Sequence, residues 1–172
     1  MGVLLLDLCH GVDTMESNCS LNNVFEEHDS SIKKIDELDL SMVKMKLCLP
    51  VEREGKGWSQ HEADDCEVWY KRFLKLCLIR SKDVVPTKLI DAMWHAHILD
   101  TRKYHADCQF IFGCYLHHFP YFGLRSEQDT HNLKKAFEGT IALFKEFFGE
   151  IPYGAGHSDC DSCGGSQCGQ TS

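Results

Sequence analysis

The stretch of sequence that decides the fold class is residues 57–79, which read GWSQHEADDCEVWYKRFLKLCLI. Within it, Ser59 and Glu62 have the Ser-x-x-Glu spacing of a capping box, in which both side chains accept hydrogen bonds from backbone N–H groups at a helix start. Apolar residues then follow at spacings of three and four, namely Ala63, Cys66, Tyr70, Phe73 and Cys77. This period predicts an amphipathic helix that ends near Ile79.

The segments on either side carry the same helical period, and each has residues that suit a helix start or end. The predicted helices run from Ser31 to about Leu47, from the region of Pro86 through Leu89 to about Leu99, from an Asp100-Thr101 cap to Gly113, and from a Ser126-Glu-Gln-Asp129 cap to Gly149. No alternating run of strand length stands out. The sequence therefore predicts an all-α fold, a compact bundle of about four to five helices.

The length and composition indicate one domain with two tails. The chain has 172 residues, which suffices for one hydrophobic core and leaves little for a second. Residues 1–30 lack a sustained period and are expected to be loosely ordered, and the helical domain is placed at 31–152. Residues 153–172 are rich in Gly, Ser and Cys and hold few large apolar side chains, so a flexible tail is predicted there.

Several function classes are disfavoured by charge and motif content. A formal net charge of -8 argues against nucleic acid as a partner, because binding its backbone needs clustered Lys and Arg. No apolar run reaches the roughly 20 residues of a membrane span, and the opening residues lack the features of a signal peptide or a lipid anchor. We therefore expect a cytoplasmic protein that does not bind membranes. The absence of a P-loop, a dinucleotide fingerprint and a nucleophile elbow indicates no nucleotide cofactor and no hydrolase triad.

The stretch from Trp94 to Pro120 concentrates histidines among apolar neighbours and is the candidate functional region. At about 100° per residue, His97 falls in the middle of the apolar face of its predicted helix, whereas His95 lies about 160° away, one turn after Asp91. One regular helix therefore does not easily present both imidazoles to one ion. His117 and His118 follow in an extended segment, where adjacent side chains point to opposite sides, so only one of the two is expected to face inward.

A set of two or three histidines with one carboxylate suits zinc or non-haem iron and leaves a position open for water or substrate. The predicted ligands of a divalent ion at this site are drawn from His95, His97, His117, His118 and Asp107. The residues predicted to orient these ligands without contacting the ion are Asp91, Tyr104 and Trp94. Asp107 lies at the edge of the inner face of the next helix, so we expect His97 and His118 to share a buried site reached from its side. The alternative is structural, since a single buried histidine more often hydrogen-bonds to a carboxylate or carbonyl in the core.

The motif in this region also resembles a known family. Asp91-Ala-Met-Trp94-His95-Ala-His97-Ile-Leu99, followed by Tyr104, Asp107-Cys108, Phe112-Gly113 and His117-His118, is similar to the glycine-rich domain-containing-protein-like family. The resemblance covers roughly residues 58–148 and implies a fold and a motif without supplying a reaction. It also favours His118 over His117, because more distant members keep one histidine in that place. Gly154 to Gly169 only hints at the glycine-rich portion.

The tail holds a second group of candidate ligands, His157, Cys160, Cys163 and Cys168. These residues are enough in number for a four-ligand zinc site. Because no fold is predicted around them, a disordered segment with reactive thiols is an interpretation supported at least as well. A redox role would need a folded βαβ context around the Cys-x-x-Cys, which the sequence does not indicate.

Two functions of different classes follow from these observations. The first is a metal-dependent enzyme in which the histidine-rich site activates water or dioxygen for a small-molecule substrate. The second is a non-catalytic interaction or metal-binding module, in which the histidines stabilise helix packing and the tail recruits a protein partner.

Overall fold

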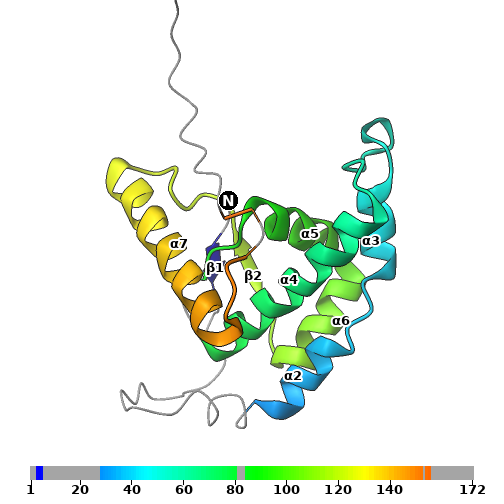
Figure 1. Cartoon of the computed structure of the whole chain (residues 1–172), viewed down its shortest axis with the longest axis horizontal. Coiled ribbons are helices and arrows are strands. Elements are labelled where there is room, and N and C mark those ends of the chain that lie inside the picture. Colours follow the sequence, from blue (N-terminus) through cyan, green and yellow to red (C-terminus); the bar gives the residue numbers. More distant parts are fainter. Residues whose placement is uncertain (1–2, 6–27, 81–83, 153, 156–172) are drawn as a thin grey trace, which may run out of the picture.

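The computed structural model describes residues 3–5, 28–80, 84–152 and 154–155, and this part of the chain is mainly helical (Figure 1). It contains six α-helices, α2 (Asp29–Asp36), α3 (Ser41–Cys48), α4 (Gln60–Ile79), α5 (Lys88–Leu99), α6 (Thr101–Phe112) and α7 (Glu127–Phe148), and a single 3-10 turn, η1 (Val51–Arg53). The prediction of an all-α fold is confirmed. The number of helices in the described ranges is six, against the four to five predicted.

Two short strands accompany the helices. β1 (Val3–Leu5) pairs antiparallel with β2 (His117–Phe119), and the backbone of Leu4 lies opposite that of His118. β1 falls in the segment predicted to be loosely ordered, so an extended pairing occurs where the sequence showed no period. It sets the register of the strand that carries two of the predicted metal ligands.

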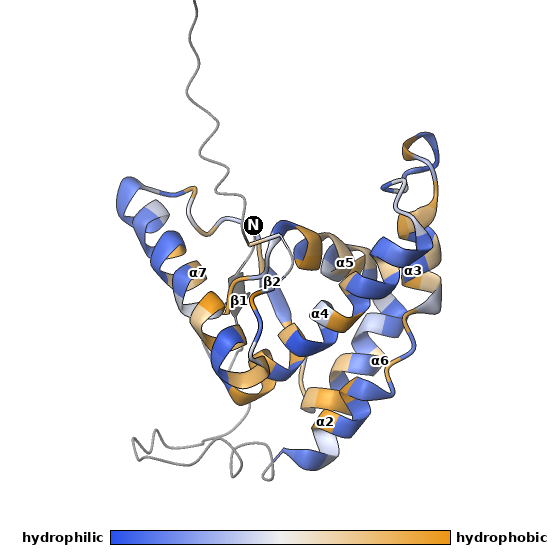
Figure 2. Ribbon diagram, viewed as in Figure 1, coloured by the Kyte–Doolittle hydropathy of each residue, from blue (hydrophilic) through white to orange (hydrophobic). Residues whose placement is uncertain are grey.

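The hydrophobic core forms around α4, which contacts α2, α3, α5 and α7. Tyr70 and Phe73 of α4 are fully buried, and the Phe73 ring lies 5.3 Å from the ring of Trp94 on α5. One turn before Phe73 on α4, Trp69 contacts Phe144 of α7 with ring centroids 5.9 Å apart. Figure 2 shows that the C-terminal half of α7 is largely hydrophobic. The N-terminal half, which lies farther from the other helices, is largely hydrophilic.

Most helix ends lie where the capping residues predicted them. In α4 the amide of Glu62 donates to Ser59 Oγ at 3.2 Å and the amide of Ser59 donates to Glu62 Oε2 at 2.8 Å, which completes the capping box. Gly113 and Gly149 end α6 and α7 with φ of 69° and 72°, a conformation that glycine adopts without a Cβ clash. The start of α5 differs from the prediction, because Thr87 is its N-cap and Pro86 lies before the helix.

The single helix predicted from Ser31 to about Leu47 is wrong, since the structure divides this segment into α2 and α3. Between them the Asp39 carboxylate accepts a 2.9 Å hydrogen bond from the amide of Ser41, and both Leu38 and Leu40 are buried. Side chains two residues apart on one helix point about 200° away from each other, so a continuous helix would expose one of these leucines. The break allows both to reach the core.

Within the described ranges, no helix has both the length and the apolar character that crossing a membrane requires. The predicted tail ligands His157, Cys160, Cys163 and Cys168 lie outside the described residues.

Candidate metal site

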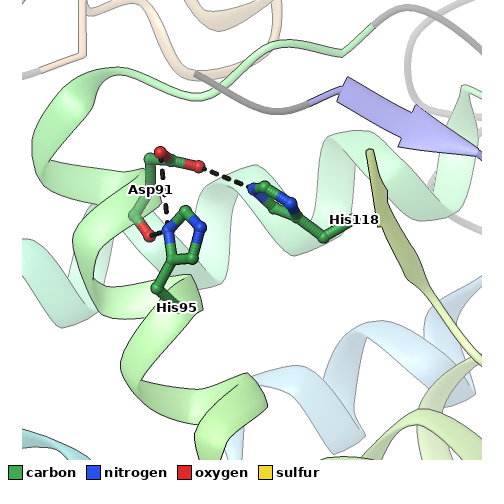
Figure 3. A group of neighbouring side chains, drawn as sticks. All are labelled: Asp91, His95 and His118. Carbon is green, nitrogen blue, oxygen red and sulfur yellow. Dashed lines mark hydrogen bonds and ion pairs between the residues drawn. The ribbon is translucent and has the colours of Figure 1, made fainter. Parts of the chain in front are cut away.

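Asp91, His95 and His118 form a cluster of potential metal ligands at the junction of α5 and β2 (Figure 3). One ligand atom from each residue lies within 4.8 Å of the other two. Two of the three come from one helix and the third comes from a strand that follows the next helix. The cluster therefore depends on how β2 packs against α5.

α5 places Asp91 and His95 on one face because residues four apart on a helix are neighbours one turn away from each other. His95 Nδ1 lies 2.8 Å from the backbone carbonyl oxygen of Asp91 and 3.5 Å from its carboxylate Oδ2. When Nδ1–H donates to this carbonyl, the lone pair of the imidazole is on Nε2. A hydrogen bond of this kind is the usual way in which a metal-binding histidine is oriented.

β2 places His118 toward the helices and His117 away from them. The His118 side chain is only 9% exposed, and its Nε2 lies 3.1 Å from Asp91 Oδ1. Its ring lies 4.4 Å from that of His95 and 4.7 Å from that of Trp94, measured between ring centroids. His117 is exposed and contacts the ring of Tyr115 instead. His118, and not His117, therefore lies in the cluster.

Two buried aromatic side chains hold the chain segment that leads into β2. Trp94 Nε1 donates to the hydroxyl of Tyr104 at 2.8 Å, and that hydroxyl donates to the carbonyl oxygen of Leu116 at 2.6 Å. Burial raises the pKa of Tyr104, so its phenol stays protonated and remains a donor. These are two of the three residues predicted to support the ligands. Tyr104 bonds to the backbone at Leu116 and Trp94 bonds to Tyr104, so neither hydrogen bond is made to an imidazole nitrogen.

His97 lies in a separate buried network, and the predicted pairing of His97 with His118 is not the arrangement in the structure. Its side chain is 2% exposed, Nδ1 is 3.0 Å from the hydroxyl of Tyr70, and Nε2 is 2.9 Å from Asp107 Oδ2. Burial raises the pKa of Tyr70. Burial also lowers the pKa of His97, and the neighbouring Asp107 carboxylate opposes this lowering. A neutral imidazole that accepts from Tyr70 and donates to Asp107 satisfies both contacts, which leaves no nitrogen for a metal.

The positions of Asp107 and Asp91 differ from those that the sequence indicated. Asp107 was expected to contribute the carboxylate ligand, but it binds His97 and also accepts from Lys103 Nζ at 2.8 Å. Asp91 was expected to orient His95 without binding the ion, but it belongs to the cluster itself. Its four-residue spacing from His95 was the signal that could have identified it, because this spacing is typical of two ligands on one helical face.

A pocket of about 490 Å³ adjoins the cluster, within the range of small-molecule sites. One wall is a stripe along α5 with the spacing of a single helical face, and the other comes from α3 and the segment after it. The lining residues are Lys88, Asp91, Ala92, His95, Ala96 and Leu99 on the first wall and Lys46, Leu47, Glu54 and Lys56 on the second. Asp91 and His95 thus belong both to the cluster and to the pocket.

A family model described as UCP032817-like matches residues 33–142, which is more than half of the chain. The chain belongs to the UCP032817-like family. This corrects the resemblance to the glycine-rich domain-containing-protein-like family that the motif suggested. The match to the UCP032817-like model contains Asp91, His95 and His118 and ends before the glycine-rich tail. No curated protein and no solved structure matches the chain.

Proposed function

We propose that Asp91, His95 and His118 bind one divalent metal ion, zinc or iron, and that the protein is a metal-dependent enzyme for a small molecule held in the adjoining pocket. The observation that carries this proposal is the convergence of two imidazoles and one carboxylate, of which His95 and Asp91 also line a pocket. Such an ion would act by polarising a substrate oxygen or by activating a bound water.

The geometry of the cluster supports a single ion. Zinc binds nitrogen and oxygen ligands at about 2.0–2.2 Å, so ligand atoms around a tetrahedral ion lie about 3.3 Å apart. The 3.1 Å separation of His118 Nε2 and Asp91 Oδ1 is already close to this spacing. His95 has a side chain that is 50% exposed, which gives it the freedom to complete the set.

The number of ligands supports catalysis over a purely structural site. Structural zinc sites are usually closed by four protein ligands, whereas catalytic sites hold three and leave a position for water or substrate. The described part of the chain brings three candidate ligands together here. Asp91 and His95 line the pocket and His118 lies behind them on the buried side, so the open position would face the pocket.

A second function, without metal, is supported by the 3.1 Å contact between His118 and Asp91. This contact by itself joins β2 to α5, and it would serve a non-catalytic module in which the histidines only stabilise packing. The two functions differ in what Asp91→Asn does. An asparagine can still hydrogen-bond to His118, but it is a much weaker metal ligand than a carboxylate.

The test is metal binding by the full chain with Cys160, Cys163 and Cys168 changed to serine, so that tail thiolates hold no ion. After removal of metal with a chelator, zinc and, without oxygen, ferrous iron are titrated by calorimetry, and bound metal is counted by elemental analysis. One ion per chain is expected. Asp91→Asn, His95→Ala and His118→Ala should each lower the affinity by about 100-fold or more. His131→Ala, an exposed histidine of α7, is the matched control and should leave it unchanged.

Two results would overturn the proposal. One is the absence of stoichiometric binding by the chain with serine in the tail. The other is an affinity for metal that is the same in the three ligand variants as in His131→Ala.

A further inference from the structure

We infer that the pocket beside Asp91 and His95 binds a small anionic molecule through its carboxylate or phosphate group. This inference deepens the proposed function and rests on it, because the anionic group would also reach the open position of the metal ion. The pocket is one that the sequence did not indicate, since its two walls come from separate helices.

The lining of the pocket is basic in a chain that is acidic. Lys46 comes from α3, Lys56 from the segment after η1, and Lys88 is the first residue of α5. The whole chain has 26 acidic and 18 basic residues, so an average patch of its surface would hold more carboxylates than ammonium groups. Three lysines around one pocket therefore form a local reversal of charge, of the kind that attracts anions.

The carboxylates of the lining do not cancel this charge once a metal is bound. Glu54 lies 3.4 Å from Lys46 Nζ, but its side chain is 91% exposed, and ion pairs between exposed groups are weak and screened by salt. Lys46 Nζ also donates to the backbone carbonyl of Arg53 at 3.2 Å. The other carboxylate, Asp91, would be neutralised by the ion that it binds. The charges of the lining residues together with the ion would then sum to a positive value.

The shape of the pocket limits the size of the anion. Ala92 and Ala96 contribute only methyl groups at successive turns of α5, next to Asp91 and His95, and this leaves space in front of the candidate ligands. Leu47 and Leu99 supply apolar surface elsewhere in the lining. A volume of about 490 Å³ suits a compact metabolite with a short apolar part better than a polymer.

The test uses the full chain, without metal and loaded with zinc, at about pH 7 and low salt. The probes are succinate, inorganic phosphate and the neutral succinamide, each titrated by calorimetry. The variant Lys56→Ala/Lys88→Ala removes two charges from the pocket. Its matched control, Lys134→Ala/Lys145→Ala, removes two exposed charges from α7 and has the same net charge. A further variant, Ala96→Leu, fills the pocket without changing charge.

We expect at least one anion to bind the wild type and the α7 control equally, and to bind the pocket-lysine variant about tenfold or more weakly. Ala96→Leu should also weaken binding, zinc should strengthen it, and succinamide should not bind. Preference for succinate or for phosphate would identify which anionic group the pocket takes. Equal affinity in the pocket-lysine variant and the control, or no binding of either anion, would overturn the inference even if zinc binds. Lysine-dependent anion binding in a chain that binds no zinc would instead overturn the proposed metal function and leave the anion pocket supported.

Discussion

The hydroxyl of Tyr104 donates a 2.6 Å hydrogen bond to the carbonyl oxygen of Leu116, two residues before His118 in the chain. It also accepts a 2.8 Å hydrogen bond from the indole of Trp94, the residue that precedes His95 on α5. One phenol of α6 is thus hydrogen-bonded to the backbone that leads to His118 and to the side chain of the residue before His95. The spacing between His95 and His118 therefore depends on Tyr104 even though it is not itself a ligand.

Tyr104→Phe should lower both metal affinity and stability. The change removes a buried donor and a buried acceptor, and losing such partners costs about 1–3 kcal/mol of the free energy of unfolding. Because His118 would be held less firmly, zinc affinity should fall by about 10- to 100-fold, as is usual when a supporting partner is removed. Calorimetry and urea unfolding measure the two effects. Tyr121→Phe, at an exposed tyrosine, is the control, and a stability loss with unchanged zinc affinity would show that Tyr104 does not support the site.

His97→Ala should reduce stability while leaving the metal in place. It removes a buried side chain and both of its hydrogen bonds, to Tyr70 and Asp107, which should cost about 2–4 kcal/mol of the free energy of unfolding. Because His97 lies outside the cluster, bound zinc per folded chain should not change. Thermal unfolding and elemental analysis test this, with exposed His105→Ala as the control. Loss of stoichiometric zinc from a folded His97→Ala chain would return His97 to the ligand set.

The parts of the fold that the sequence predicted are those decided by local hydrogen bonds. The Ser59 and Glu62 capping box and the left-handed Gly113 and Gly149 depend on residues within one turn of a helix end, and all are present. The break between α2 and α3 depends instead on Leu38 and Leu40 both reaching the core. That requirement comes from tertiary packing, which helical period alone does not contain.

The candidate site divides in the same way. The spacing of Asp91 and His95 is local, and so their shared face could be read from the sequence. The place of His118 depends on β2 pairing with β1, whose residues are more than a hundred positions earlier in the chain. His97 hydrogen-bonds with Tyr70 of α4, a helix that the sequence could not orient relative to α5. The separate partners of His97 and His118 therefore follow from contacts distant in sequence.

Gly55→Ala should destabilise the protein and weaken anion binding in the pocket. A Cβ at this position would lie 1.8 Å from the carbonyl oxygen of Leu49, so the backbone would have to move. Moving it displaces the adjacent Lys56, whose amide is bonded to the carbonyl of Leu47 at 2.9 Å. We expect a loss of about 1–3 kcal/mol in the free energy of unfolding, the usual cost of overpacking.

Gly139→Ala is the matched control for this change. A Cβ there meets nothing within 4 Å, and the residue is in the interior of α7. Since alanine favours a helix over glycine by about 1 kcal/mol, this variant should be more stable than the wild type. Urea unfolding of both variants gives the comparison, and a Gly55→Ala chain as stable as Gly139→Ala would contradict the packing around Leu49.

Asp129 should make the stability of the protein depend on pH in the acid range. Its carboxylate accepts hydrogen bonds from the amide of Gly123 at 2.7 Å and from the Arg125 side chain, and so ties the segment after β2 to the first turn of α7. The Arg125 guanidinium is the main cause that lowers the pKa of Asp129 to about 2, with the backbone amides adding to it. In the unfolded chain an aspartate has a pKa of about 3.9.

The sign of the effect follows from these two pKa values. Between them the unfolded state binds more protons than the folded state, so the stabilisation by Asp129 is complete above about pH 4 and is lost as the pH falls toward about 2. The Asp129→Asn chain lacks this contribution at every pH. The difference in free energy of unfolding between wild type and Asp129→Asn should therefore be largest near pH 5 and shrink steadily toward pH 2, as measured by urea unfolding at steps between these values. Glu138→Gln removes an exposed carboxylate from the same helix and corrects for net charge. A difference that stays constant or grows on acidification would mean that the carboxylate of Asp129 is not held by Arg125 in solution.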